Sequence, residues 1–119
     1  MAMQPVRTAT PVRTTTTPRG QQVVIEGRLD VRTAADLRLA LHEAIATGSG
    51  DLHLHLGAAE IGDATGLGVL VESHHRARRE GRRLVLAEVT PRTERLLRAS
   101  RLSRVLHRPE PATVAPLTA

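Results

Sequence analysis

Residues 51–70 read DLHLHLGAAEIGDATGLGVL, and two patterns in this stretch predict a strand that leads through a short turn into a helix. Asp51–Gly57 alternates strictly, with leucines on one face and His53 and His55 on the other, which is typical of a strand with one buried face. Apolar residues then follow at helical spacing from about Thr65 to Glu80. The predicted inner face of that helix consists of Leu67, Leu70, Val71, His74 and Ala77. This strand–turn–helix unit indicates an α/β fold.

A second unit of the same kind precedes it. Gln22–Gly27, QVVIEG, is rich in β-branched residues and is predicted to be a strand. Thr33, with Asp36 three residues later, resembles an acidic capping box that would begin a helix. Gly48 is placed to end this helix. Its predicted buried face consists of Leu37, Ala40, Leu41, Ala44 and Ile45.

A third strand and helix follow. Gly81 is placed to end the second helix, and Arg82–Val89, RRLVLAEV, is predicted to be the next strand. Thr90–Pro91 is typical of an N-cap followed by proline at the first helical position, so a third helix is expected over about 91–101. The apolar residues of this helix are Leu96 and Leu97.

The two ends of the chain have a different composition. The N-terminal segment is rich in Thr, Pro and Arg and 108–119 carries three prolines, and residues 1–10 and 108–119 are expected to be disordered. Threonines over 11–17 favour an edge strand, followed by a turn, and Arg104–His107 is expected to form a short last strand. We therefore predict one domain over 11–107, with a mixed sheet of four to five strands and helices packed mainly on one face.

The composition excludes several classes of protein. The 119 residues include no Cys, which excludes disulfides and thiolate chemistry, and no Phe, Tyr or Trp, which argues against readers of single-stranded RNA that stack bases on rings. The net charge is +5, and all seventeen cations are Arg. Neither a signal peptide nor a membrane span is evident, so a cytoplasmic location and no membrane partner are expected.

The candidate chemical sites are weak ones. His53 and His55 share a strand face and His74 and His75 lie on the second helix, but no further ligand is identified, so no metal site is expected. No hydroxyl is placed beside a histidine in a recognisable catalytic arrangement, and the chain has no Lys for a phosphate-binding Walker loop. We predict neither an enzyme nor a cofactor.

Gly62–Gly68 at the start of the second helix is the segment with the strongest functional signal. Asp63 is expected to cap the helix, whose N-terminus would favour an anion or a phosphorylated side chain. Gly66 and Gly68 lack side chains that would obstruct a partner's backbone. Nucleic-acid binding is not expected, because a whole strand separates the second and third helices and no helix-turn-helix is formed.

Four segments together resemble the STAS domain, most closely that of bacterial anti-sigma factor antagonists. They are VVIEGRLDVRTAADLRLAL (Val23–Leu41), DATGLGVLV (Asp63–Val71), GRRLVLAEVTPRTERLL (Gly81–Leu97) and ASRLSRVL (Ala99–Leu106). The resemblance covers roughly residues 21–107, with the motifs in the family's order and spacing. It implies the same small mixed sheet with helices that the residue patterns predict.

The resemblance also implies a binding surface. Asp30 takes the place of the acid in the family's G-E-L-D turn, where Arg28 replaces the usual Glu. Asp63 matches the loop acid, and Ala64 stands where the family usually carries the Ser that accepts phosphate. Thr65 is the next hydroxyl. The partner-binding residues implied by the resemblance are Asp30, Gly62, Asp63, Ala64, Thr65, Gly66, Leu67 and Gly68.

The implied partner is an anti-sigma factor that is itself a serine/threonine kinase with the histidine-kinase-like ATPase fold. Its capture by the antagonist would release a sigma factor and so regulate transcription. Because Ala64 lacks a hydroxyl, two forms of regulation are open: an antagonist without an off-state, or a switch that uses Thr65. A nucleotide- or phosphate-sensing STAS module, or a STAS scaffold with another protein partner, is the alternative.

Overall fold

The computed structural model describes residues 12–102 and Leu106, and these residues form seven elements in the order β-β-α-β-α-β-α. The strands are β1 (Arg13–Thr16), β2 (Gln22–Leu29), β3 (Leu52–Ile61) and β4 (Leu84–Ala87). The helices are α1 (Ala34–Thr47), α2 (Ala64–Arg79) and α3 (Pro91–Ala99). The predicted α/β class, the element order and the N-terminal edge strand are confirmed. Of the predicted strand at 104–107 only Leu106 is described, as a buried residue in a bend; its other residues and the predicted disordered ends lie outside the described residues.

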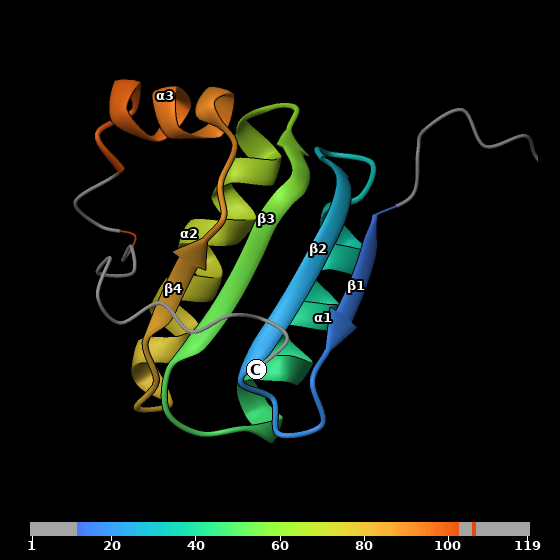
Figure 1. Ribbon diagram of the computed structural model, residues 1–119, viewed down its shortest axis with the longest axis vertical. Helices are drawn as coiled ribbons and strands as arrows, with labels where there is room; N and C mark the ends of the chain where they lie inside the picture. Colours follow the sequence, from blue (N-terminus) through green and yellow to red (C-terminus); the bar gives the residue numbers. More distant parts are fainter. Residues whose placement is uncertain (1–11, 103–105, 107–119) are drawn as a thin grey trace, which may run out of the picture.

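The four strands form one mixed sheet in the order β1-β2-β3-β4 (Figure 1). β1 pairs antiparallel with β2, whereas β2, β3 and β4 are parallel neighbours. The register places Val23 opposite Leu54 and Leu54 opposite Leu86, so one row of buried side chains crosses three strands. This row forms the sheet's half of the core.

The helices α1 and α2 cover the same face of the sheet, and α3 lies across the end toward which the parallel strands run (Figure 1). The buried residues of α1 are Ala34, Leu37, Leu41, Ala44 and Ile45. Those of α2 are Gly66, Val69, Leu70, Ser73, His74 and Ala77. The prediction that helices pack mainly on one face is thus confirmed. The described helices include none that is long and apolar enough to span a membrane.

The orientation of α2 differs from the prediction. Leu67 and Val71 were expected on its core face but are only half-buried, whereas Val69 and Ser73 are buried. A Cβ on Gly66 would overlap the carbonyl group of Leu29, so the helix must turn its Gly66 side against the end of β2. This contact moves Leu67 and Val71 to the edge of the interface.

The predicted capping box at the start of α1 is wrong. The Thr33 hydroxyl makes no capping hydrogen bond to the helix. It donates to the carbonyl oxygen of Arg28 at 2.7 Å and accepts from the Asp30 amide at 3.0 Å. The hydroxyl is therefore committed to the turn after β2 and is unavailable to the first turn of α1.

The C-terminal end of α1 is capped by Arg82, which was predicted to lie in a strand. The Arg82 guanidinium donates to the carbonyl oxygens of Ala44 and Ile45 at 2.9 and 3.0 Å, and to that of Gly20 at 2.6 Å. Arg82 is only 5% exposed, and desolvation lowers its pKa. β4 accordingly begins at Leu84. Gly48 does end α1, and its φ of −123° shows that close packing against Gly20, rather than a left-handed turn, requires glycine there.

Candidate functional site

Asp63 joins the two loops that meet at the end of the parallel strands. One carboxylate oxygen, Oδ1, accepts the Gly66 amide at 3.0 Å and so caps α2, as predicted. The other, Oδ2, accepts the Val31 amide at 3.0 Å from the loop between β2 and α1. The hydrogen bonds from these two amides lower the pKa of the Asp63 carboxyl. One ionised side chain thus holds two segments in a single surface.

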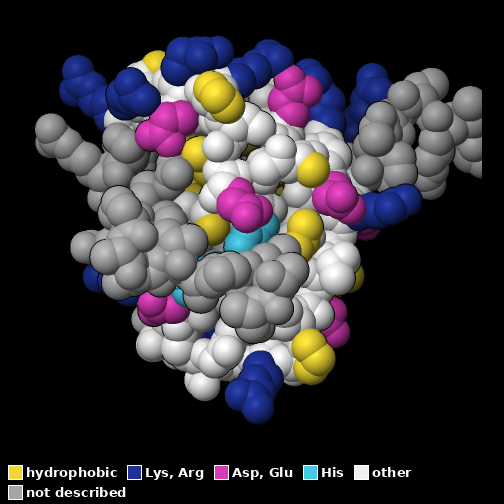
Figure 2. Space-filling view, in the orientation of Figure 1, with side chains coloured by type: hydrophobic (Ala, Val, Ile, Leu, Met, Phe, Trp, Pro, Cys, Tyr) yellow, Lys and Arg dark blue, Asp and Glu magenta, His cyan; other side chains and the backbone are white. Residues whose placement is uncertain are grey.

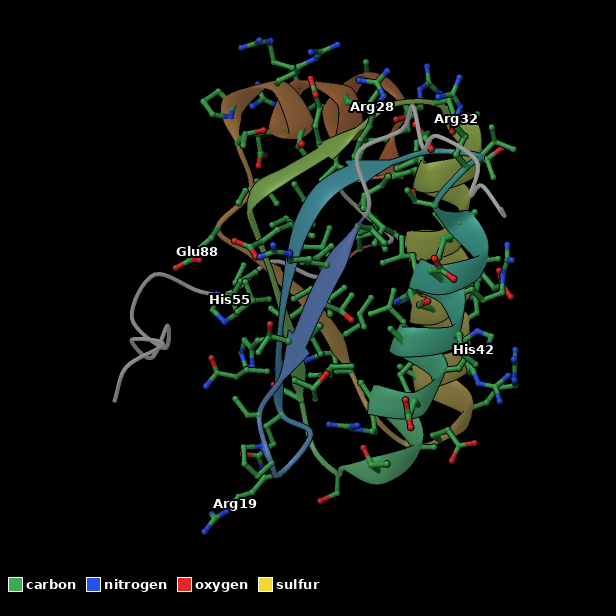
Figure 3. All side chains as sticks on the ribbon, turned by 90° about the vertical axis from the view of Figure 1, so that its right-hand side faces the viewer. Arg19, Arg28, Arg32, His42, His55 and Glu88 are labelled. Atoms are coloured by element: carbon green, nitrogen blue, oxygen red, sulfur yellow. The ribbon has the colours of Figure 1, made fainter. Side chains whose placement is uncertain are left out.

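Asp30 organises the neighbouring turn. Its Oδ1 accepts the amides of Arg32 and Thr33 at 2.9 and 3.3 Å, and its Oδ2 lies 3.3 Å from Nε of Arg28. Figure 3 shows Arg28 and Arg32 at the same end of the molecule. The Asp30 carboxylate is therefore engaged within the chain, where it sets the shape of the turn.

The glycines at this end have different environments. Gly66 is buried against the Leu29 carbonyl group, so its missing side chain is explained by packing within the chain. Gly62 lies beneath the Arg28 guanidinium, and a Cβ there would come within 2.6 Å of Nε. Gly68 is exposed, and a Cβ there would meet no atom within 4 Å.

The exposed part of the surface lies around the first turn of α2. Ala64 and Thr65 are the first two residues of the helix and both are exposed. Val31, whose side chain was not among the predicted site residues, is 66% exposed on the adjoining loop. Of the predicted residues, the exposed ones are Asp63, Ala64, Thr65 and Gly68, the half-buried ones are Asp30, Gly62 and Leu67, and Gly66 is buried.

A groove runs beside this helix start and continues along α2. Its first part, about 470 Å³, lies between α2 and α3. Its second part, about 620 Å³, follows the exposed side of α2, and the two parts meet at Ala64 and Leu67. We call the two together the α2 groove. The residues that line its first part are Ile61, Gly62, Asp63, Ala64, Leu67, Arg92, Thr93, Leu96 and Ser100.

The contribution of α3 to this groove was missed from the sequence. Arg92, Leu96 and Ser100 line it, whereas the sequence analysis named Leu96 and Leu97 together as the apolar residues of this helix. Leu97 is buried and Leu96 is only half-buried. The signal available was the adjacent leucine pair, since successive helical residues point about 100° apart and a short helix can bury one while the other lies at the edge of the core. Choosing between the two requires the orientation of α3.

Arginines surround this end of the molecule. In Figure 2, dark blue side chains gather along the edge where α3 lies in Figure 1. Two of the arginines, Arg28 and Arg92, pair with the same carboxylate, Glu60; the Arg28–Glu60 distance is 3.5 Å. The positive charge of these two arginines is thus partly neutralised by Glu60.

The four histidines singled out in the sequence do not converge. His55 was expected on a solvated strand face but is 4% exposed, with Nε2 2.9 Å from Oε1 of Gln22 and Nδ1 3.1 Å from Oε1 of Glu88. Figure 3 shows His55 and Glu88 on the sheet face away from α1 and α2. His74 is buried in α2 and His75 is exposed. Within residues 12–102, three or more metal-ligating side chains nowhere form a group that could hold an ion.

Fold and site together define a small α/β domain that exposes a capped helix start and an adjoining groove, an arrangement suited to binding. The family model described as Mlab, STAS domain matches residues 12–108. The chain belongs to the STAS domain family, as its motifs predicted.

Solved structures share this fold. The unphosphorylated form of the anti-sigma factor antagonist SpoIIAA is 17% identical with a TM-score of 0.64, over 85% of this chain and 90% of that one. A Thermotoga maritima protein assigned as an anti-sigma factor antagonist is 20% identical with a TM-score of 0.65, over 82% and 84% of the two chains. A STAS domain protein from Planctomyces limnophilus is 17% identical with a TM-score of 0.63, over 83% and 89%. No curated protein matches the chain significantly.

Proposed function

We propose that the chain is an anti-sigma factor antagonist that acts by binding, without catalysis, in the cytoplasm. Its partner is an anti-sigma factor of the kinase type with the histidine-kinase-like ATPase fold. The observation that carries the proposal is the Asp63 carboxylate, which joins the amides of Val31 and Gly66 and so presents Val31, Ala64 and Thr65 as one surface.

The site's chemistry supports binding rather than catalysis. Asp63 and Asp30 both commit their carboxylates to backbone amides, which leaves them as poor general bases. The side chains exposed at the first turn of α2, Ala64 and Thr65, are small and uncharged. Such a surface permits close approach by another protein, and a phosphate placed on it would add charge that a close-packed interface disfavours.

Regulation at this site depends on position 65. Ala64 has no hydroxyl, whereas Thr65 is exposed and follows it directly in the first turn of α2. Incubation with the cognate anti-sigma factor and ATP, followed by peptide mass mapping, decides between the two forms of regulation. Phosphate on Thr65 establishes a switch, and its absence throughout the chain establishes an antagonist without an off-state.

Partner capture tests the function itself. The full chain should retain a kinase with the histidine-kinase-like ATPase fold, and Thr65→Arg, which places a long cation on the exposed surface, should abolish retention. Arg19→Glu is the matched control, because Arg19 is exposed at the opposite end of the molecule (Figure 3). Capture that survives Thr65→Arg would contradict the proposed surface.

Calorimetry distinguishes the anti-sigma factor antagonist from the alternative, a nucleotide- or phosphate-sensing module. A sensing module should bind ATP, GTP or their diphosphates with micromolar affinity without a partner protein. An antagonist should show no such heat and should bind the anti-sigma factor.

A further inference from the structure

We propose that the α2 groove binds a helix of the partner that carries an apolar stripe flanked by acidic residues. This inference rests on the proposed function only in that both require a protein partner. It names the partner's docking element and extends the contact from the start of α2 along the length of that helix to α3.

The groove has the length and shape of a helix-binding site. Its second part is lined by residues that recur along one side of α2: Ala64, Leu67, Gly68, Val71, Glu72, His75 and Arg79, with Leu102 beside them. From Ala64 to Arg79 a helix rises about 22 Å, or four turns. Amphipathic helices bind in grooves of this kind through side chains spaced three and four residues apart.

The floor of the groove is apolar. Leu67, Val71, Leu96 and Leu102 are half-buried, and each of them lines the groove. Half-buried leucines and valines along one continuous hollow provide apolar area that a partner's stripe can cover.

Gly68 is the second, independent observation. It lies inside α2, where glycine destabilises a helix relative to alanine. A Cβ at this position would meet nothing within 4 Å among the described residues, so packing within that part of the chain does not require glycine. The absence of a side chain leaves the backbone open to close approach from outside. It is also where a second helix could cross α2 most closely.

Charge selects an acidic occupant. Two acids line the groove: Glu72 lies 2.9 Å from Nε of Arg38, and the Asp63 carboxylate, which keeps its charge, accepts two backbone amides at the start of α2. By contrast, several arginines of α2, α3 and the residue pair that follows α3 make no ion pair within residues 12–102. They are Arg76, Arg78, Arg79, Arg95 and Arg101. Arg79 lines the groove itself.

A protein helix explains these features better than a nucleic acid does. The arginines would bind the backbone phosphates of a nucleic acid, but the apolar side chains of Leu67 and Val71 would not. An apolar stripe with acidic residues beside it complements both the apolar floor and the arginines that line the groove, Arg79 and Arg92.

Peptide binding provides the test. The chain has no Trp, Tyr or Phe, so the emission of a single Trp in a peptide reports binding without background. The probe is a helical peptide of about 16 residues, long enough to span four turns, with Leu at three- and four-residue spacing, one Trp in that stripe and Glu on both flanks. Its partner probe replaces every Glu by Lys. At low salt we expect saturable binding of the Glu peptide, at least about tenfold tighter than that of the Lys peptide.

Variants of the full chain locate the contact. Gly68→Leu should weaken binding of the Glu peptide about tenfold by filling the groove, and Arg79→Glu about fivefold by reversing a rim charge. Arg19→Glu should leave the affinity unchanged. Gly68→Ala separates docking from folding, because it should raise the melting temperature and still weaken binding.

Three results would overturn the inference: equal affinity for the two peptides, binding unaffected by Gly68→Leu and Arg79→Glu, or tighter binding of a short DNA duplex than of the Glu peptide. A failure of the proposed function would give a different result from a failure of this inference. If no anti-sigma factor is captured but the Glu peptide binds with this variant pattern, the docking element is correct and the partner is of another kind.

Discussion

Gly66 packs directly on Leu29, since a Cβ at position 66 would overlap the carbonyl group that ends β2. Gly66→Ala is therefore expected to lower the free energy of unfolding by about 3 kcal/mol or more, because the atoms that must move are backbone atoms. Urea unfolding followed by circular dichroism measures this. Gly68→Ala, two residues away on the open side of the same helix, is the matched control and should raise the free energy of unfolding slightly. Equal effects of the two substitutions would contradict the packing described here.

Asp63 predicts a stability change at acid pH. Hydrogen bonds from the Gly66 and Val31 amides lower its pKa in the folded state, so folding favours the carboxylate. The resulting stability is present above the unfolded pKa of about 3.9 and is lost as the pH falls through the lower folded value. Between pH 7 and pH 3, the melting temperature of Asp63→Asn should fall by less than that of the wild type. Parallel profiles would show that these amide bonds do not stabilise the carboxylate.

The lowered pKa of His42 on α1 predicts a second change of stability with pH, closer to neutral pH. Burial, followed by the charge of Arg76, lowers its pKa, and the folded state therefore favours the neutral ring. Above the unfolded-state pKa of about 6.5, the ring is neutral in both states and does not lower the free energy of unfolding. As the pH falls below that pKa, the unfolded state takes up the proton more readily, and the free energy of unfolding declines. His42→Gln should reduce the loss of melting temperature between pH 7.5 and pH 5.5. His75→Gln, at an exposed position on α2, should not, and an NMR titration of the His42 ring checks the direction independently.

Arg82 should be the arginine most sensitive to substitution. Its guanidinium donates to the carbonyl oxygens of Ala44, Ile45 and Gly20, and a lysine offers a single point charge to the same set. Arg82→Lys is expected to cost about 2 kcal/mol and Arg82→Ala about 3 kcal/mol, since buried acceptors lose their donors. The neighbouring Arg83 pairs with Asp51 at an exposed site, and Arg83→Lys should cost less than about 1 kcal/mol. Chemical denaturation of the three variants measures the contrast.

Ala64→Ser tests the proposed regulation by adding a hydroxyl where the family usually carries one. Position 64 is exposed at the first residue of α2, so the new hydroxyl is accessible. With a cognate anti-sigma factor kinase and ATP, Ala64→Ser combined with Thr65→Ala should incorporate phosphate on the introduced hydroxyl and then lose its affinity for that partner. The single variant Thr65→Ala should incorporate none. A double variant that stays unmodified would show that the partner is not a kinase for this site.

Local patterns were enough to predict the order of the elements and both side-chain caps. The caps at Asp63 and Thr90 could be predicted because an N-cap residue bonds an amide of its own helix, three residues along the chain. Thr90, for example, accepts the Thr93 amide at 3.1 Å. The Thr33 cap failed because a distant part of the same turn, the Arg28 carbonyl, competes for its hydroxyl. Rotation of α2, burial of His55 and the α3 side of the groove likewise depend on partners on other elements. Spacing along one segment carries no information on these.

The Arg82 contacts also constrain the order of assembly. Gly20 and Arg82 are 62 residues apart, and the α1 carbonyls that Arg82 satisfies lie 37 and 38 residues before it. The end of α1 therefore stays uncapped until the segment leading into β4 has docked, so the first β-α unit cannot reach its final form alone. Because these hydrogen bonds join α1 and Gly20 to the segment before β4, we expect the two halves of the chain to unfold in one cooperative transition. Amides at the end of α1 should accordingly exchange with solvent only when the whole domain opens.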